Sequence, residues 1–424
     1  MSATSTTLRV LISGAGVAGP VAAYWLAKAG HHVTVIDRAP CLRKEGQTVD
    51  IRQEGLRVIE WMGIRALVDE RTTKEAGMRL VDDKEAVWAA FGQSGDKGFT
   101  SEVEIVRGEL SNLFYEISRD NVTYLFDTTI DQISETDGGV RVTWKGQIGG
   151  QQEPTTFDVI IVAEGLYSRT RAKAFQEDIG SPVRSLDFFS ASFSLPANES
   201  DTSWADWRSY SKRRMVLSRP DGFGRTRVSV GWFDEGSESR TIAHPKTPID
   251  TKKAYIKQRF QDLDSPALVR FFDGLAVSDD LYLAEIGQTK APSWSRGRVV
   301  LLGDTAFCPS ALTGMGTTSA IAGAYILAAE LVRNPTDPMK AFAVYEKHVR
   351  PWVEKIQKLP PGWATFSHPD SRAGVVFLYW TAYMISLIIK LGVFNLFSRL
   401  LPSRDQNMSL PPPSTFDRIS KLLA

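Results

Sequence analysis

The run GAGVAG, Gly14 to Gly19, has the residue types and spacing that bind the phosphates of a dinucleotide. In this GxGxxG pattern Gly14 permits a tight turn, Gly16 lets a pyrophosphate approach the backbone, and Gly19 lets the next helix pack closely. The pyrophosphate is then expected at the positive N-terminus of that helix. Asp37, about twenty residues further on, is placed to accept hydrogen bonds from a ribose.

A second candidate lies far away in the sequence, in LLGDTAFCPSALTGMGT, Leu301 to Thr317. An apolar run ends at Asp304, and a loop containing Gly314 and Gly316 leads into a small, apolar helical segment. A carboxylate followed by backbone shaped for close approach fits a ligand site. The alternative is a structural strand-to-helix turn with Asp304 as its cap. The segment contains neither a hydrolytic triad nor a metal-ligand pattern, and we predict no metal.

The elements around GAGVAG are those that a dinucleotide site requires. A buried strand, Arg9 to Ser13, precedes the motif, a helical pattern follows it, and a second strand, Val33 to Arg38, contains the acid. This strand–glycine–helix–strand–acid unit predicts a Rossmann-like site without deciding between NAD and FAD. The predicted cofactor site also includes Val17, Ala18 and Arg38.

Composition narrows the function classes. The 424 residues are 43% hydrophobic and carry a formal net charge of +1, which gives no field to attract nucleic acid. Two cysteines, Cys41 and Cys308, are too few for a disulfide framework. The start lacks the features of a signal peptide. We therefore expect a cytoplasmic location.

The strand and helix patterns divide the chain into four regions. Residues 1–181 have the alternating strand and helix patterns of an α/β domain, and residues 182–285 are rich in β-strand patterns and aromatic residues. Residues 286–350 again contain buried-strand patterns, and residues 351–424 have helical patterns. We predict an α/β fold in which 1–181 and 286–350 form one nucleotide-binding domain. Residues 182–285 are expected to form a β-sheet substrate domain, and the remainder C-terminal helices.

Three ordered motifs resemble those of the single-component, FAD-dependent aromatic hydroxylases, of which p-hydroxybenzoate hydroxylase is the best-known type. They are GAGVAG with Asp37, the D-x4-A-E-G-x2-S-x2-R run from Asp158 to Arg171, and GDTAFCPSALTGMG. Within that family, the sequence is most similar to the branch of tetracycline-inactivating monooxygenases and natural-product hydroxylases. The resemblance covers about residues 8 to 350 and implies a GR2-type FAD-binding domain.

The resemblance assigns roles to residues outside GAGVAG. It implies that Asp304 binds the ribityl or pyrophosphate region of a non-covalent FAD. Gly314, Met315 and Gly316 would bring a helix N-terminus under the isoalloxazine. Gly165, in the second motif, belongs to the same site.

An arginine is expected against the flavin at Arg107, because the family places one there and its fork of donors suits phosphate or a flavin carbonyl. The alternative is a surface arginine paired with Glu104 or Glu109.

Weaker candidates line the flavin edge and the substrate. Asp50 is assigned to the cofactor and Arg52, beside it, to the substrate. Tyr210, Arg213 and Trp232 are expected to face the substrate from the β-rich domain. The sequence identifies no catalytic residue.

Two departures from the family pattern affect the active-site loop. Glu164 stands where the second motif usually has Asp, which weakens the expected link between flavin and nicotinamide binding. In the third motif Phe307 replaces a common His, and Pro309 is the single proline. Neither change removes a group that flavin binding requires.

The reaction implied by the resemblance is monooxygenation. NADPH or NADH binds transiently and reduces the FAD, since a second dinucleotide fingerprint is absent from the sequence. O2 then gives a flavin C4a-hydroperoxide, which hydroxylates or epoxidises an aromatic or polyketide-like small molecule. Natural-product biosynthesis or xenobiotic inactivation would use this chemistry.

Two other function classes remain open. One is another FAD enzyme of the same fold, a halogenase or a reductase, although WADW, Trp204 to Trp207, lacks the spacing of the halogenase W-x-W-x-I-P motif. The other is a non-catalytic nucleotide-binding redox module.

The C-terminal region contains an apolar stretch, residues 373–397. Seventeen uncharged residues separate Arg372 from Lys390, which is the lower limit for a membrane-spanning helix. We predict a pair of helices packed on the catalytic body. The alternative is peripheral contact with a membrane.

Overall fold

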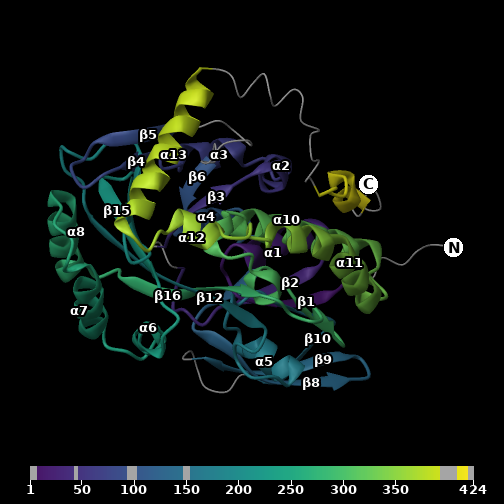
Figure 1. The fold of residues 1–424 in the computed structure, drawn as a ribbon. Coiled ribbons are helices and arrows are strands. Elements are labelled where there is room, and N and C mark those ends of the chain that lie inside the picture. Colours follow the sequence, from purple (N-terminus) through teal and green to yellow (C-terminus); the bar gives the residue numbers. More distant parts are fainter. Residues whose placement is uncertain (1–6, 43–45, 93–102, 147–152, 392–407, 419–424) are drawn as a thin grey trace.

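Two large sheets, with helices packed on them, make up the mixed α/β fold (Figure 1). The structure is a computed structural model that describes residues 7–42, 46–92, 103–146, 153–391 and 408–418. Its N-terminal motif and its aromatic-rich segment lie in different sheets.

The first sheet has six strands, and its central strands are buried because apolar runs such as RVLIS and VIIV are covered on both faces. Neighbours are parallel except for the edge pair β17–β18. The order is β17 (Ser295–Arg296), β18 (Val299–Leu301), β11 (Val159–Val162), β1 (Arg9–Ser13), β2 (His32–Ile36) and β7 (Thr123–Leu125).

Helices and a small sheet cover this first sheet. Helix α1 (Ala18–Lys28) contacts β1 and β2, and α10 (Gly316–Arg333) and α4 (Arg107–Glu116) pack on α1. A three-stranded sheet contacts β1 and β11 and consists of β8 (Thr128–Thr136), β9 (Gly139–Gly146) and β10 (Thr155–Phe157).

The register of the first sheet brings distant motifs to one edge. Ser13 pairs with Val162, which in turn pairs with Leu301. These residues end three adjacent parallel strands, and GAGVAG, the Glu164 motif and the Asp304 motif follow them. In open parallel sheets, ligands bind at this carboxyl edge.

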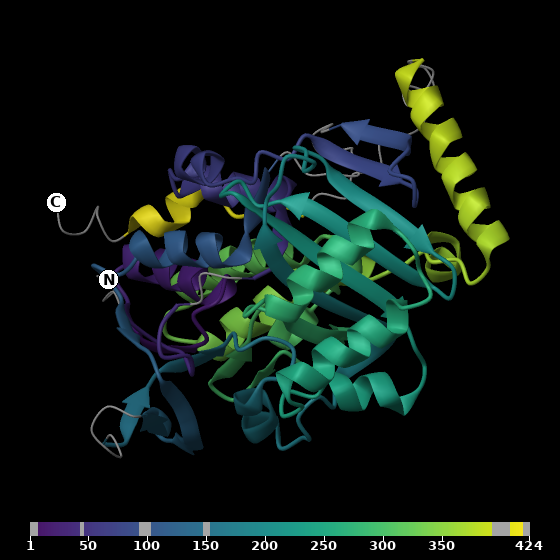
Figure 2. The same cartoon turned by 90° about the vertical axis from the view of Figure 1, so that its left-hand side faces the viewer.

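The second sheet has seven strands and extends further than residues 182–285, because it also takes in β4 and β5. Its order is β16 (Tyr282–Thr289), β12 (Val183–Pro196), β15 (Arg225–Phe233), β14 (Arg214–Pro220), β13 (Ala205–Tyr210), β4 (Gly77–Val81) and β5 (Val87–Gly92). Helices α6 (Ser237–Ala243), α7 (Ile249–Phe260) and α8 (Pro266–Val277) lie against one of its faces (Figure 2).

A two-stranded sheet and short helices join the two large sheets. The two strands are β3 (Thr48–Ile51) and β6 (Val103–Val106), which are antiparallel. The connecting helices are α2 (Gln53–Trp61), α3 (Arg65–Glu70), α5 (Arg169–Phe175) and α9 (Asp304–Phe307), with a short 3₁₀ turn, η2 (Ala311–Thr313).

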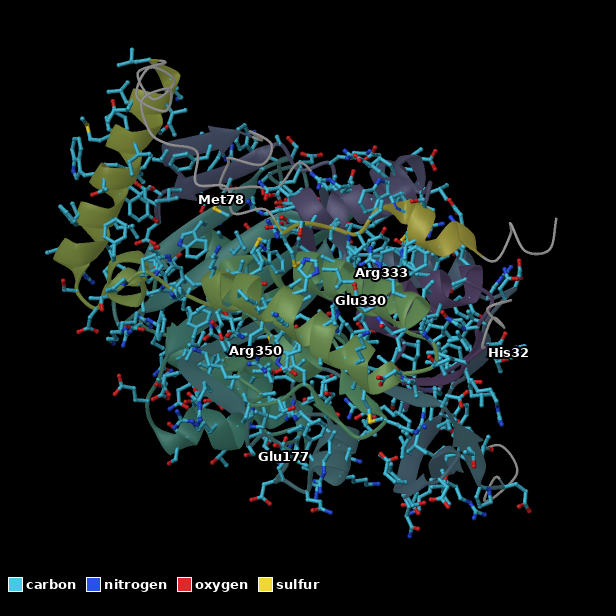
Figure 3. The ribbon with its side chains drawn as sticks, turned by 90° about the vertical axis from the view of Figure 1, so that its right-hand side faces the viewer. His32, Met78, Glu177, Glu330, Arg333 and Arg350 are labelled. Atoms are coloured by element: carbon cyan, nitrogen blue, oxygen red, sulfur yellow. The ribbon has the colours of Figure 1, made fainter. Side chains whose placement is uncertain are left out.

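The C-terminal part begins with α11 (Pro338–Ile356), which packs on α10, and continues through α12 (Trp363–Ser367) to α13 (Arg372–Lys390). Figure 3 shows Glu330 and Arg333, which form an ion pair in the last turns of α10. The 3₁₀ segment η3 (Pro413–Arg418) returns to the core, where Phe416 is 2% exposed and packs against Trp25. Residues 408–418 are therefore part of the catalytic body.

Helix α13 packs by one side only, on β5 and β13. It is the one helix in the described residues that is long and apolar enough to cross a membrane by length and composition, with a mean hydropathy of 1.6. Only 22% of that stretch is buried. The second helix predicted after it, up to residue 397, lies outside the described residues.

Candidate functional site

The three glycines of GAGVAG have three different surroundings. Gly14 has φ +118°, and an added Cβ would lie 2.3 Å from the Ala163 carbonyl oxygen. A Cβ on Gly19 would lie 2.0 Å from the Gly14 oxygen. A Cβ on Gly16 would meet nothing within 4 Å. Gly14 and Gly19 therefore permit the backbone packing, whereas Gly16 borders open space at the start of α1, where a pyrophosphate fits.

Asp37 shapes the loop that carries this motif. Its Oδ2 accepts from the Ala15 amide at 2.8 Å and its Oδ1 accepts from the Ala39 amide at 2.8 Å. Each oxygen keeps further acceptor capacity, so the carboxylate can also take a ribose hydroxyl. Arg38 is exposed beside it, while Val17 and Ala18 pack against the core.

The second and third motifs are joined through Thr305. The Gly165 amide donates to Thr305 Oγ1 at 2.9 Å, and buried Arg171 donates to the Thr305 carbonyl at 2.8 Å. Glu164, the departure from the family pattern, accepts from the hydroxyls of Ser13 and Ser168 at 2.5 and 2.7 Å. The longer acid thus ties the end of β1 to the start of α5.

In the part of the chain that the structure describes, neither Asp304 nor Arg107 forms an ion pair, so both are available to a ligand. Burial raises the pKa of Asp304, while a hydrogen bond with the Cys308 thiol and the charge of Arg107 act in the opposite direction. Within the described ranges, no other side chain donates to the Asp304 carboxylate, although the Thr289 hydroxyl donates to the Asp304 backbone carbonyl at 2.7 Å. Arg107 is exposed, and Glu104, one of its alternative partners, instead pairs with Arg219 at 3.2 Å.

The glycine loop lies against β3. Gly314 has φ +64°, and a Cβ there would meet Asp50 Oδ2 at 3.1 Å, while Asp50 pairs with Arg52 at 3.3 Å. Gly316 begins α10, and a Cβ on it would meet nothing within 4 Å. Met315 precedes it and packs on the core. A second helix N-terminus therefore opens toward the same space.

These surroundings fit FAD. Two glycines border open space at helix N-termini. The Asp304 carboxylate and the Arg107 guanidinium lie near each other, and neither forms an ion pair with another described residue. The helix amides and Arg107 would hold the phosphates and the flavin carbonyls, and Asp304 would hold ribityl hydroxyls.

Comparison with known proteins agrees with this geometry. Residues 7–357 match the family described as FAD binding domain. The chain belongs to the FAD-binding monooxygenase family. The FAD-dependent monooxygenase asL4 of Sarocladium schorii is 31% identical over 90% of this chain and 93% of its own length. The flavin-dependent monooxygenase eupH of a Phoma species is 34% identical, over 87% and 90%.

A solved structure shows the same fold. The crystal structure of tetracycline destructase Tet(55) is similar to this monooxygenase with a TM-score of 0.73 and 26% identity, over 89% of this chain and 97% of that one. The present chain is thus an FAD-dependent oxidoreductase of mixed α/β fold.

Asp304→Ala is expected to lower the FAD content of the purified monooxygenase strongly, because the variant loses the carboxylate that the structure leaves free for ribityl hydroxyls. The absorbance ratio of flavin to protein measures this. Asp83→Ala, an exposed acid on the β4–β5 turn, is the control. Equal occupancy in both variants would contradict the role of Asp304.

Strand alternation divides the side chains of the seven-stranded sheet between its two faces. Phe188, Met215 and Phe233 lie on one face together with Leu312 from η2, next to the glycine loop. Phe189 and Val230 lie on the other face, against α7 and α8. The first face therefore borders the flavin site of the monooxygenase.

This alternation corrects two predicted substrate residues. Trp232 is fully buried on the helix-covered face, where its Nε1 donates to Ser239 Oγ at 3.0 Å. Tyr210 is 4% exposed on the same face. Arg213, by contrast, is half-buried and lies over the Phe233 ring, 4.2 Å from its centroid. Phe233 replaces Trp232 as the candidate.

His368, which sequence reasoning passed over, packs against this face. Its ring contacts Phe188, Trp207 and Phe233, with centroids 5.1 to 5.7 Å away. Burial and the charge of Arg213 lower the pKa of His368 to about 4, so the ring is neutral at physiological pH. The neutral ring therefore adds no positive charge to the aromatic face.

A buried charge cluster lies beneath Asp50. Arg219 pairs with Glu75 at 3.0 Å and with Glu104 at 3.2 Å, and both carboxylates are at most 3% exposed. Burial raises the pKa of Glu104 to about 8 against the opposing charge of Arg219, with Glu75 and Asp50 adding to the increase. The cluster joins β14 to β6 and therefore the substrate sheet to the flavin domain.

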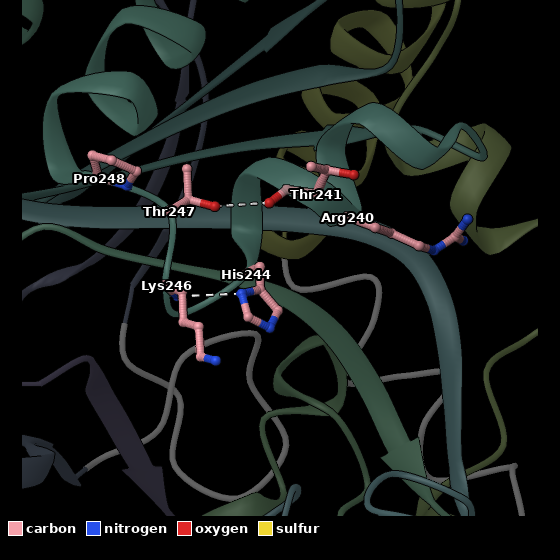
Figure 4. Close-up of a pocket in the computed structure, with 6 residues that line it drawn as sticks. All are labelled: Arg240, Thr241, His244, Lys246, Thr247 and Pro248. Carbon is pink, nitrogen blue, oxygen red and sulfur yellow. Dashed lines mark hydrogen bonds between the residues drawn. The ribbon is translucent and has the colours of Figure 1, made fainter.

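A surface hollow at the end of α6 lies apart from the candidate flavin site. Figure 4 shows its six lining residues, of which His244 accepts from the Lys246 amide at 3.2 Å and Thr247 donates to the Thr241 carbonyl at 2.9 Å. None of the predicted cofactor residues lines it, and we assign it no role.

Proposed function

We propose that this monooxygenase uses NADPH or NADH and O2 to place one oxygen atom, as a hydroxyl or an epoxide, on an aromatic or polyketide-like small molecule. The second oxygen atom leaves as water. Bound FAD supplies the oxygen chemistry. The chain's own residues bind the cofactor, orient the substrate and exclude water.

The observation that carries the substrate class is the aromatic face beside the glycine loop. Leu312 of that loop packs with Phe188 and Phe233, and half-buried Trp207 joins the same cluster. A planar, apolar molecule fits between this face and the flavin site. Arg213, over the Phe233 ring, supplies a cation that favours an acidic phenol or enol on the substrate.

Two further observations support transient nicotinamide binding and a cytoplasmic location. The sheet order provides a single Rossmann-like unit among the described residues, which favours a nicotinamide that binds transiently. Cys41 and Cys308 are both free thiols, in agreement with a reducing, cytoplasmic compartment. The relatives' names point to natural-product chemistry or drug inactivation as settings.

Oxygen-18 gas tests the reaction. The yellow protein is first screened with aromatic polyketides, tetracyclines, indoles and quinolones for ligands that accelerate NAD(P)H oxidation. A product that contains one oxygen atom from O2 supports the proposal. A product oxygen from water, a chlorinated product or a merely dehydrogenated substrate would show a different flavin enzyme. Reduction without any substrate dependence would favour a reductase or a redox module.

Phe233→Ala is expected to raise the hydrogen peroxide released per nicotinamide oxidised several-fold, because water would enter where the aromatic face has been opened. A peroxide assay beside NAD(P)H absorbance measures the ratio. Trp232→Phe, the neighbouring change on the helix-covered face, should leave the coupling at the wild-type value. If both variants uncoupled equally, the assignment of the two faces would be wrong.

A further inference from the structure

Helix α13 exposes an apolar face along most of its length. From Val376 to Ile389, every exposed side chain is aliphatic, aromatic or a thioether, and Phe377 and Trp380 are 64% and 52% exposed. The exposed set is Val376, Phe377, Trp380, Tyr383, Met384, Ile385, Ile388 and Ile389, with Leu391 just after the helix. An apolar face of this extent marks an interaction site.

The opposite face fixes the helix to the protein. Tyr379 Oη donates to the Val81 carbonyl at 2.7 Å and accepts from the Ser209 amide at 3.1 Å. Ser386 Oγ donates to the Ala90 carbonyl at 3.1 Å. Leu378 and Ala382 pack with Tyr379 against β4 and β5. A helix anchored along a sheet edge in this way cannot span a bilayer, but its outer face is free to lie on one (Figure 2).

Cations outnumber acids on α13 and in the sequence next to it. The only charged residues of α13 are Arg372 and Lys390, at its two ends. The sequence from Ser371 to Arg404 contains four cations, and one acid adjoins each of its ends, Asp370 and Asp405. Basic residues that flank an apolar helical face are typical of helices that bind anionic lipid.

Nearby acids do not cancel these charges at the apolar face. Asp82 accepts from the Trp88 indole at 2.9 Å, and Glu85 pairs with Arg208 at 2.5 Å. Asp83 interacts with the charges of Arg208 and Arg372, at the N-terminal end of α13. These acids belong to the β4–β5 turn and are engaged with the protein.

We propose that α13 docks this monooxygenase on a phospholipid bilayer that carries anionic headgroups. The helix lies in the plane of the interface, with its outer apolar face among the upper acyl chains and its terminal cations at the headgroups. Trp380 and Tyr383 suit that depth, because indole and phenol rings favour the membrane interface. A second copy of the chain fits less well, since a two-fold contact would bring two basic segments together.

Vesicle flotation with the full-length, FAD-loaded protein tests this surface. The vesicles are phosphatidylcholine alone, and phosphatidylcholine with about one third phosphatidylglycerol. We expect binding that is about tenfold stronger to the anionic vesicles, as two cations near the surface would give. Trp380→Ser/Ile388→Ser should lower that binding at least about tenfold. Val269→Ser/Val277→Ser, which replaces two exposed apolar residues of α8, should not change it.

Several outcomes would overturn the proposal. They are absence of binding to either vesicle, equal binding of the α13 and α8 variants, and equal binding to neutral and anionic vesicles. A dimer in light scattering that the α13 variant abolishes would assign the face to a second copy instead. Both variants change exposed positions, so their FAD content and melting temperature should match those of the wild type and thereby exclude misfolding.

Discussion

Gly16→Val is expected to give a folded protein that does not retain FAD. A Cβ at Gly16 meets nothing within 4 Å, so the substitution should change the stability of the FAD-free protein by no more than about 0.5 kcal/mol. The same side chain fills the space beside the N-terminus of α1 where a pyrophosphate must approach the backbone. Flavin absorbance after gel filtration measures retention.

The neighbouring glycines provide the control. Gly14→Ala puts a Cβ 2.3 Å from the Ala163 oxygen at φ +118°, and Gly19→Ala puts one 2.0 Å from the Gly14 oxygen. Both should lose about 3 kcal/mol or more of folding stability, because backbone atoms must move. Stability is compared with FAD-free wild type, since loss of a bound ligand itself lowers the melting temperature. FAD retention by Gly16→Val would contradict the assigned site.

The sequence predicted the FAD fold well because its motifs are local. Strand, glycine loop, helix and acid follow one another within GAGVAG and its flanks, so their geometry is set by near neighbours. The same holds for the loop after Asp304. The contact between Gly165 and Thr305 joins residues 140 positions apart and was not predicted. Only the family resemblance placed Gly165 in the flavin site.

Features that depend on distant strands were harder to predict. Aromatic content indicated the β-rich sheet, but successive side chains of a strand point to opposite faces. Trp232 lies on the face covered by α7 and α8, and Phe233 lies on the other face. The sequence does not show which face the helices cover. The sheet also recruits β4 and β5 from before residue 93. His368 escaped notice because the rings around it come from β12, β13 and β15.

The buried cluster of Arg219, Glu75 and Glu104 was also invisible in the sequence, since its members lie on three separate segments. Removing its cation leaves Glu75 and Glu104 buried without a compensating positive charge. Arg219→Met is therefore expected to lower the free energy of unfolding by about 3–5 kcal/mol. Arg296→Met is the control and should be nearly neutral, because Arg296 is exposed and its side chain donates to Gln176 at the surface.

The pH dependence of the unfolding free energy tests whether buried charge causes the stability loss in Arg219→Met. In the native protein the pKa of Glu104 is raised from 4.5 to about 8. The native state therefore keeps a proton that the unfolded state releases, and the wild type loses stability as the pH rises through this window. Without Arg219 both carboxyl pKa values rise further, so the deficit of Arg219→Met should be larger at about pH 8.5 than at about pH 5.

Denaturant unfolding at these two pH values, with FAD removed from every sample, measures the difference. Glu104→Gln takes away the main titrating group and should flatten the dependence on pH. In the Arg219→Met background it should also restore part of the lost stability, because only Glu75 is then left buried without a cation. A deficit in Arg219→Met that is the same at both pH values would mean that lost packing, and not buried charge, explains the role of Arg219.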